Sequence, residues 1–295
     1  MAKMYFAKMN INEQIYEMYE GKQNLEELVK KIFAGLSTKI NIYDDKGGRI
    51  KLFDLDISPE GLKITGNLGY IKRGVHSSYD PEKDTAIDTT DNNKINYVSF
   101  YFDLENEILA YMTIPTLGRK QVLKYFQGLI KEGSNVGVEF LQESNVADIK
   151  REISKFQRIS KLEVKLVPPN GDKEDFADLA SLTVDRIQES NATKIKQQFQ
   201  TQRKEGIKKD SKLVKNYITA AGLGYSEIKF SGKDTSGQNF EVSSDKTTPY
   251  TKMVSSDQTK NHSQIANVGR AGIISILEYR TKERMRLDRN RKQNK

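Results

Sequence analysis

Four lysines that precede a glycine-rich segment are the residues best suited to binding a polyanion. They are spaced by three and four positions, which places them on one face of a predicted helix over residues 208–222. The surrounding residues 194–217 have eight lysines and arginines against two carboxylates, a net charge of +6. Such a face can contact the phosphates of a nucleic acid, although an ordinary solvated helix face has the same pattern. The lysines are Lys208, Lys209, Lys212 and Lys215.

The glycine-rich segment places Gly222 and Gly224 directly before Tyr225, at the start of a predicted strand over residues 225–232. Glycine lets a backbone approach a ligand closely and can aim N–H groups at phosphate. Residues 222–232 resemble the glycine-rich loop of the repeat-associated RNA-binding proteins of CRISPR systems, with a different spacing. That resemblance implies RNA binding by the segment. The simpler alternative is a helix C-cap at Gly222 and a turn at Gly224.

A second basic segment ends the chain, and arginine predominates in it. Residues 280–295 have eight lysines and arginines against two carboxylates, again a net charge of +6. The planar guanidinium group suits phosphate, and such tails can become ordered on contact with nucleic acid. A disordered, solubilising end is the alternative. The candidate contact residues are Arg280, Arg284, Arg286, Arg289 and Arg291.

Two predicted strands each place a glutamate two positions before a lysine. The pairs are Glu163 with Lys165 and Glu227 with Lys229. This pattern is the second half of the PD-(D/E)xK nuclease signature, in which carboxylates hold Mg²⁺ and the lysine assists the attacking water. No Pro-Asp turn precedes either pair, and alternating charge on a solvent-facing strand produces the same sequence. A catalytic role for these four residues therefore stays open.

Other side chains point to packing more than to chemistry. Tyr97 and Tyr101 share one face of a predicted strand, where an RNA-recognition sheet would stack bases, but the segment lacks the basic residue and glycine of that consensus. Ordinary packing is the alternative. The two histidines, His76 and His262, have no metal-like spacing, and there is no cysteine, P-loop or dinucleotide fingerprint. We expect no metal site and no cofactor, and the sequence favours binding over catalysis.

The composition is typical of a polar cytoplasmic protein. The chain has 295 residues, of which 36% are hydrophobic and 30% charged. It has no apolar run of about 18 residues and no apolar stretch at its start, so we expect neither a membrane span nor a secretory signal. The net charge is +8, and the two basic segments leave −4 for the remainder. This separation of charge suggests a polyanionic partner.

The stretch 136–170 organises the elements that position these residues. Predicted strands over 136–141 and 161–167 flank a predicted helix over 145–156, whose apolar side chains repeat at three and four positions. Two strands joined by one helix are normally parallel, with a right-handed crossover. Residues 76–93 have no such pattern, and their polar composition predicts a mobile loop.

The order of elements predicts an α+β fold with ferredoxin-like or RRM-like units, in which helices cover one side of a mixed sheet. We expect an N-terminal α+β domain with hairpins over residues 1–134. A ferredoxin-like domain containing the strand–helix–strand unit follows over residues 135–279, and a basic tail over residues 280–295.

Four segments spread along the chain are similar to one known family. They are residues 4–11, 99–108, 162–170 and 224–245. The family is an uncharacterised bacterial one, a domain of unknown function found among phage-defence and abortive-infection genes. The resemblance covers most of the chain and implies a role in bacterial defence. It carries over no catalytic residues.

The sequence therefore predicts a nucleic-acid-binding protein, with RNA favoured over DNA, that acts in bacterial anti-phage defence. The lysines of the predicted helix, the glycine-rich segment and the arginines of the tail would form the contact surface. One alternative is a metal-dependent nuclease in the same setting. Another is a scaffold or assembly subunit whose partner is a different protein or a second copy of the chain.

Overall fold

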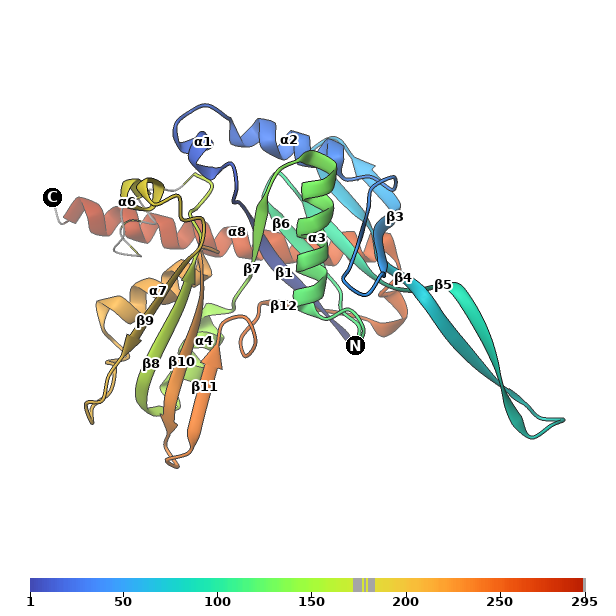
Figure 1. Cartoon of the computed structure of the whole chain (residues 1–295). Helices are drawn as coiled ribbons and strands as arrows, with labels where there is room; N and C mark the ends of the chain where they lie inside the picture. Colours follow the sequence, from blue (N-terminus) through green and yellow to red (C-terminus); the bar gives the residue numbers. More distant parts are fainter. Residues whose placement is uncertain (172–176, 178, 180–183, 294–295) are drawn as a thin grey trace.

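β1 lies next to one edge of the larger of two antiparallel sheets in the computed structural model of the chain, where it pairs with three other strands (Figure 1). The structure describes residues 1–171, 177, 179 and 184–293, with the backbone alone at 184, 290, 291 and 293. The eight-stranded sheet has the order β12-β1-β6-β5-β4-β3-β2, and β7 also pairs with β1. Its strands are β1 (Ala2–Ile11), β2 (Asn41–Tyr43), β3 (Arg49–Ser58), β4 (Lys63–Asp80), β5 (Thr85–Asp103), β6 (Ile108–Tyr111), β7 (Val138–Gln142) and β12 (Thr251–Val254).

Helices cover both faces of this first sheet. α2 (Leu25–Gly35) and α3 (Arg119–Ser134) pack together, and α8 (His262–Gln293) crosses the sheet. Alternation along β5 separates the two sides: Phe100 packs edge-on against Phe126 of α3, whereas its neighbour Tyr101 lies beneath α8. Because side chains alternate along a strand, α3 and α8 lie on opposite faces.

The second sheet has four strands in the order β11-β10-β8-β9. On β8, Leu162, Val164 and Leu166 are buried while the residues between them are partly exposed, as the period of two predicts. The buried side chains join those of α4 and α7 in a core separate from that of the first sheet. These elements are α4 (Val146–Ser154), β8 (Phe156–Leu166), β9 (Ile195–Gln200), α7 (Lys212–Gly222), β10 (Ser226–Asp234) and β11 (Asn239–Ser243).

The long helix α8 links the two sheets. Its 32 residues span about 48 Å at 1.5 Å per residue. Gly269 lies against Tyr101 in the first sheet, whereas Tyr279 and Leu287 pack against the core of the second. Figure 1 shows α8 running behind both sheets, with its C-terminal turns beyond the second. The sequence predicts a last helix over residues 265–279. α8 is longer and includes most of the predicted basic tail.

The predicted α+β class is confirmed, but the predicted strand–helix–strand unit is wrong. β7 pairs with β1 in the first sheet, and β8 pairs with β9 and β10 in the second. All described strand pairs are antiparallel, so neither a parallel crossover nor a mixed sheet is found, and a ferredoxin-like arrangement is not confirmed. The partner of β7 lies more than a hundred residues upstream, beyond the reach of a local pattern. The division into domains stays a prediction. β7 and β12 lie within residues 135–279, the predicted second domain, but both belong to the first sheet.

The predicted loop over residues 76–93 is also wrong. β4 and β5 pair through this region, from His76 opposite Thr89 to Asp80 opposite Thr85. The hairpin extends far from the body of the molecule (Figure 1). Neither of its faces packs on a core here, so the strands lack the apolar alternation by which a half-buried strand is recognised.

The sequence predicts a helix over residues 25–35 with Asn24 as its cap, besides the helix over residues 145–156, and both helices are confirmed. Asn24 caps α2 by accepting a hydrogen bond from the Glu26 N–H at 2.9 Å, and Asn145 caps α4. The sequence also predicts a helix over residues 173–189, and about half of that range lies outside the described residues. Its last part is observed as α6 (Val184–Glu189). No helix in the described ranges is long and apolar enough to cross a membrane.

Candidate nucleic-acid interface

A cationic groove lies between α4, α7 and α8. We call it the α7 groove and define it by its charged lining, which consists of five cations and one carboxylate. It has a volume of about 820 Å³, and its apolar lining includes Ile153, Ile218 and Leu287. The predicted lysine segment and the predicted arginine tail therefore meet here. The charged residues are Lys150, Lys209, Asp210, Lys212, Lys215 and Arg286.

The predicted lysine face is only partly formed, because α7 begins at Lys212 and not at Lys208. Ser211 is the N-cap and accepts a hydrogen bond from the Val214 N–H at 3.4 Å. Lys209 precedes the helix and donates to the Ser154 carbonyl at 3.1 Å and to the Phe156 carbonyl, next to the end of α4. Lys208 is exposed and does not line the groove. Lys212 and Lys215 remain exposed on α7, one turn apart.

The arginines of the predicted tail divide into exposed and buried groups on α8. Arg286 lines the α7 groove, pairs with Glu283 at 2.7 Å and donates to Thr219 Oγ1 at 3.3 Å. Arg289 is exposed and donates to the Met285 carbonyl at 3.3 Å. Arg284 is partly buried and donates to the Tyr225 hydroxyl at 3.0 Å. The side chain of Arg291 lies outside the described part of the chain.

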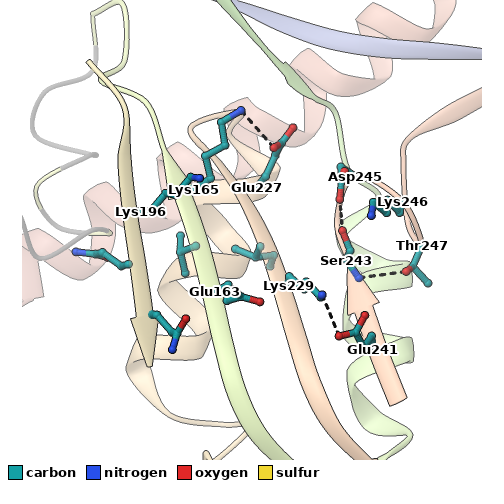
Figure 2. Close-up of a pocket in the computed structure, with 14 residues that line it drawn as sticks. Glu163, Lys165, Lys196, Glu227, Lys229, Glu241, Ser243, Asp245, Lys246 and Thr247 are labelled. Atoms are coloured by element: carbon teal, nitrogen blue, oxygen red, sulfur yellow. Dashed lines mark hydrogen bonds and ion pairs between the residues drawn. The ribbon is translucent and has the colours of Figure 1, made fainter. Parts of the chain in front are cut away.

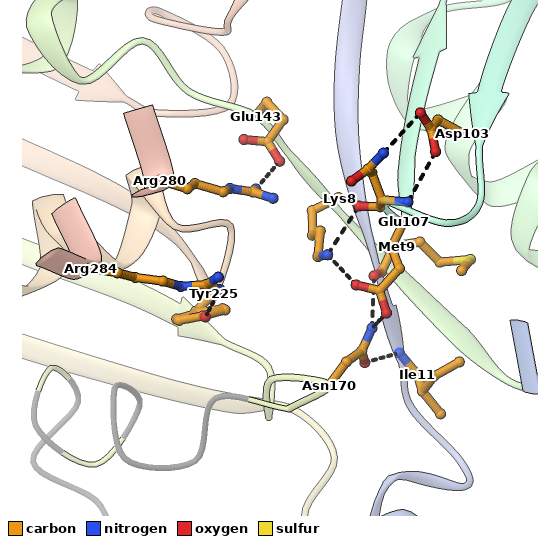
Figure 3. A network of polar contacts seen from close by, with 11 residues as sticks. Lys8, Met9, Ile11, Asp103, Glu107, Glu143, Asn170, Tyr225, Arg280 and Arg284 are labelled. Atoms are coloured by element: carbon orange, nitrogen blue, oxygen red, sulfur yellow. Dashed lines mark hydrogen bonds and ion pairs between the residues drawn. The ribbon is translucent and has the colours of Figure 1, made fainter. Parts of the chain in front are cut away.

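Arg280 was predicted to contact nucleic acid, but it is buried between the two sheets and cannot do so in this structure. Its guanidinium is 5% exposed and pairs with Glu143, which is 2% exposed. Figure 3 shows this pair beside Lys8, which pairs with Glu107, and Asn170, which donates to Glu107 at 2.6 Å. Burial raises the pKa of the Glu143 carboxyl, against the opposing charges of Arg280 and Lys8. The first tail arginine is therefore a structural residue.

The predicted phosphate loop at Gly222 and Gly224 is wrong for the same reason. Both glycines and Tyr225 are buried against α8. Gly222 ends α7, and a Cβ there would meet Tyr279; Gly224 has φ +81° and faces Arg280 and Lys8. The alternative, a helix end followed by a turn, is confirmed. The glycines permit close packing between the two sheets, and none of their backbone is presented to a ligand.

The two glutamate–lysine strands lie side by side on the outer face of the second sheet (Figure 2). Lys165 is opposite Glu227, and Glu163 is opposite Lys229, so each charge faces its opposite across the strands. Lys165 Nζ lies 2.8 Å from Glu139 and 3.5 Å from Glu227, and Lys229 pairs with Glu241 at 2.9 Å. These carboxylates are engaged by lysines, and no group of three metal-ligating side chains occurs among the described residues.

Glu227 on this outer face has a raised pKa. Burial is the main cause, and the charge of Lys165 opposes that effect incompletely. The pKa of Glu139 is lowered, because hydrogen bonding and charge from Lys165 and Lys194 outweigh the effect of burial. Lys165 therefore lies between one carboxylate that the fold stabilises and one whose ionisation the fold opposes.

We expect Glu227→Gln to stabilise the protein at neutral pH and to have little effect at acid pH. A folded-state pKa above the unfolded value means that the fold favours the protonated form, so ionisation costs stability once the pH passes the unfolded value of about 4.3. Glutamine carries no charge at any pH. Urea denaturation of both proteins across about pH 4 to 8 would measure this difference. The expectation would be contradicted if the stability of the variant relative to wild type were lower at pH 7 than at pH 4.

The tyrosine platform predicted as an alternative use of β5 is not available. Tyr101 is 1% exposed beneath Gly269 of α8. Tyr97 is partly buried, packs edge-on against Phe53 and lies under the Lys260 ammonium at 4.6 Å from the ring centroid. Ordinary packing, the alternative interpretation, therefore describes this strand.

Sequence reasoning missed several cations that the fold gathers. Lys150 of α4 lines the α7 groove, and Lys120, Lys124 and Lys246 line a second cleft between α3 and the second sheet. None of them lies in a conspicuous charge run. Lys150 is on the polar side of a strongly amphipathic helix, a weak signal, but only packing of that helix against α7 and α8 places it in the groove.

Comparison with known proteins identifies a family but no characterised relative. The sequence model of a family described as a domain of unknown function, DUF4747, matches residues 2–269. No curated protein matches the chain.

Proposed function

We propose that this chain, which belongs to the DUF4747 family, binds nucleic acid in the α7 groove, with RNA preferred over DNA. The observation that supports this proposal is the charge of the groove: five cations converge there, Asp210 is the one carboxylate of the lining, and Glu283 pairs with Arg286. Phosphate contacts supply most of the affinity of non-specific nucleic-acid binding, so a local excess of cations is the feature that such binding requires.

Exposed cations on α8 extend the groove along the helix. Lys282, Arg286 and Arg289 are exposed and spaced by four and three residues, so they form one stripe along the C-terminal turns. A strand in the groove can continue onto these turns beyond the second sheet. These cations lie on a helix, whereas the alternative interpretation of the sequence is a disordered tail. Two of them, Arg286 and Arg289, are among the predicted contact residues.

The lining of the groove suits a single strand. Leu287, which is only partly buried, offers apolar surface to unstacked bases, beside lysines that can pair with phosphates. The exposed Ser154 hydroxyl lines the groove and can accept a hydrogen bond from a 2′-OH, the group that distinguishes RNA from DNA. These features support the preference for RNA. We also propose that the protein acts in bacterial anti-phage defence. This part of the proposal rests on the family resemblance in the sequence.

We expect the double substitution Lys212→Ala/Lys215→Ala to weaken RNA binding about 25-fold at ~0.1 M salt. Losing two phosphate contacts lowers the slope of log affinity against log salt by about 1.4 on a single strand, at about 0.7 per contact. Fluorescence anisotropy of a labelled single-stranded RNA, titrated at several salt concentrations, measures both quantities. The DNA strand of the same sequence provides the comparison for RNA preference.

Lys31→Ala/Lys39→Ala is the matched control, because it removes the same charge from exposed positions on and after α2. The control should retain wild-type affinity and slope. Equal losses in both double variants would assign binding to net charge and not to the α7 groove. A wild-type protein that binds neither RNA nor DNA at ~0.1 M salt would overturn the proposal.

The metal-dependent nuclease has no observation in its favour among the described residues. Its candidate residues, Glu163 with Lys165 and Glu227 with Lys229, are opposed across neighbouring strands and engaged in ion pairs. No further carboxylate completes a metal-binding group in the part of the chain that the structure describes.

A further inference from the structure

The hairpin of β4 and β5 ends in an arm that no other part of the chain covers. We define the arm as residues 74–92, which pair with each other from Gly74 opposite Asp91 to the turn after Asp80. Almost all of its residues are exposed, including the apolar side chains of Val75 at 51%, Tyr79 at 66% and Ile87 at 44%. An isolated two-stranded hairpin is marginally stable in water, so an arm of this length gains stability from a partner.

The arm is strongly acidic in a basic protein. It has five carboxylates against one lysine, a net charge of −4, whereas the whole chain has a net charge of +8. Its partner should therefore be cationic and should offer apolar surface to Tyr79 and its neighbours. The acidic residues are Asp80, Glu82, Asp84, Asp88 and Asp91.

A cleft of matching charge lies between α3 and the outer face of the second sheet. It has a volume of about 710 Å³ and is lined by seven cations and three carboxylates, a net charge of +4. Leu123, which is only partly buried, contributes apolar surface to its lining. We call it the sheet cleft; it is continuous with the pocket in Figure 2, with which it shares Lys165, Lys196 and Lys246.

Four cations of the sheet cleft are available to a partner. Within the described ranges, no carboxylate lies at ion-pair distance from any of them, and all four are exposed. By contrast, Lys165 and Lys194 of the same cleft are paired with Glu139. The available cations are Lys120, Lys124, Lys196 and Lys246.

The arm of a chain does not reach its own sheet cleft. Figure 1 shows the arm leaving the first sheet on the side away from the second sheet, with α3 between them. β4 and β5 are continuous from the body of the sheet into the arm, so the arm is an extension of the sheet and not a flexible tether. Docking must therefore take place between two molecules.

We propose that the arm of one copy of this protein docks in the sheet cleft of a second copy. The charges of −4 and +4 match, and the exposed Val75, Tyr79 and Ile87 meet the apolar lining of the cleft. Because each copy has both an arm and a cleft, two copies can exchange arms reciprocally and close a two-fold dimer. The α7 groove lies on the opposite face of the second sheet and stays open in such a dimer.

Sedimentation velocity of the full chain, freed of nucleic acid by nuclease treatment and high salt, tests this association. We expect a dimer at ~0.05 M salt that dissociates at ~0.5 M, because charge complementarity is screened. Lys120→Glu/Lys124→Glu takes the net charge of the cleft from +4 to 0, and Glu82→Lys/Asp88→Lys takes that of the arm from −4 to 0. Each variant alone should be monomeric at concentrations where the wild type is a dimer, since both of its contacts then lack opposite net charges.

An equimolar mixture of the two variants should form a heterodimer, because the unchanged arm of one variant, at −4, then meets the unchanged cleft of the other, at +4. At the second contact, the introduced lysines of the arm meet the introduced glutamates of the cleft. This restoration distinguishes docking from misfolding, and circular dichroism of each variant confirms its fold. The proposal is overturned by a wild type that is monomeric at ~0.05 M salt, by variants that dimerise as the wild type does, or by a mixture that stays monomeric. The substituted residues lie outside the α7 groove, so RNA binding can fail or succeed independently.

Discussion

Replacing Arg280 by methionine is expected to destabilise the protein by about 3–5 kcal/mol. The substitution keeps much of the side-chain volume but leaves the carboxyl of Glu143, which is 2% exposed, without its guanidinium partner. An uncompensated buried charge costs far more than a surface pair contributes. Urea or guanidinium denaturation at pH 7 would measure the loss. RNA affinity of the folded variant should be unchanged, because the side chain does not reach the α7 groove.

The pH dependence of this variant identifies the mechanism. Burial already raises the pKa of Glu143, and Arg280 opposes that shift, so its removal raises the pKa further. A carboxyl with a raised folded-state pKa is unfavourable only when ionised, so the loss of stability should shrink as pH falls towards about 4. Arg280→Met/Glu143→Leu should recover much of the loss, and Arg289→Met should show none. A loss independent of pH would contradict the ion-pair explanation.

Gly224→Ala is expected to destabilise the protein by about 2–5 kcal/mol, combining an unfavourable backbone conformation with overpacking. Gly224 has φ +81°, a conformation that L residues rarely adopt. A Cβ there would also lie 3.2 Å from the Lys8 Cβ and would collide with the guanidinium of Arg280. That guanidinium cannot move away without disturbing its pair with Glu143. Thermal and chemical denaturation measure the effect.

Gly237→Ala separates the two contributions. Gly237 has a similar φ of +78°, but a Cβ there would have nothing within 4 Å. Its substitution should cost about 1–2 kcal/mol, the conformational part alone. Equal costs at the two positions would mean that the contact between the two sheets at Gly224 contributes nothing. Gly224→Ala should also have a larger effect on the free energy of unfolding than on the free energy of RNA binding by the folded fraction. A phosphate loop at Gly224 would show the opposite.

The elements predicted correctly are those with strong local signals. α2 and α4 have capping asparagines and apolar side chains at three- and four-residue spacing, and β8 alternates buried and exposed residues. In each case the period of burial follows from the geometry of the element itself. The β4–β5 arm was missed because it touches no core, so its sequence is under no requirement to alternate.

The candidate site was predicted less well, because the sequence does not show whether a basic side chain faces solvent or a buried carboxylate. Arg280 and Arg289 both lie in the basic tail, yet only Arg289 is exposed. Lys209 and Lys212 are equally basic, yet Lys209 is bonded to backbone carbonyls next to the end of α4. Lys150 was overlooked because its neighbours in the groove come from α7 and α8.

The sequence by itself determined the α+β class, most helix and strand positions and the presence of two basic segments. These properties depend on composition and on periodicity within a single element. Only the tertiary structure decided that β7 joins β1, that Gly224 and Arg280 lie between the sheets, and that Lys150, Lys212 and Arg286 share one groove. The physical reason is that long-range pairing and burial of charge depend on residues far apart in the chain, whose proximity no local pattern encodes.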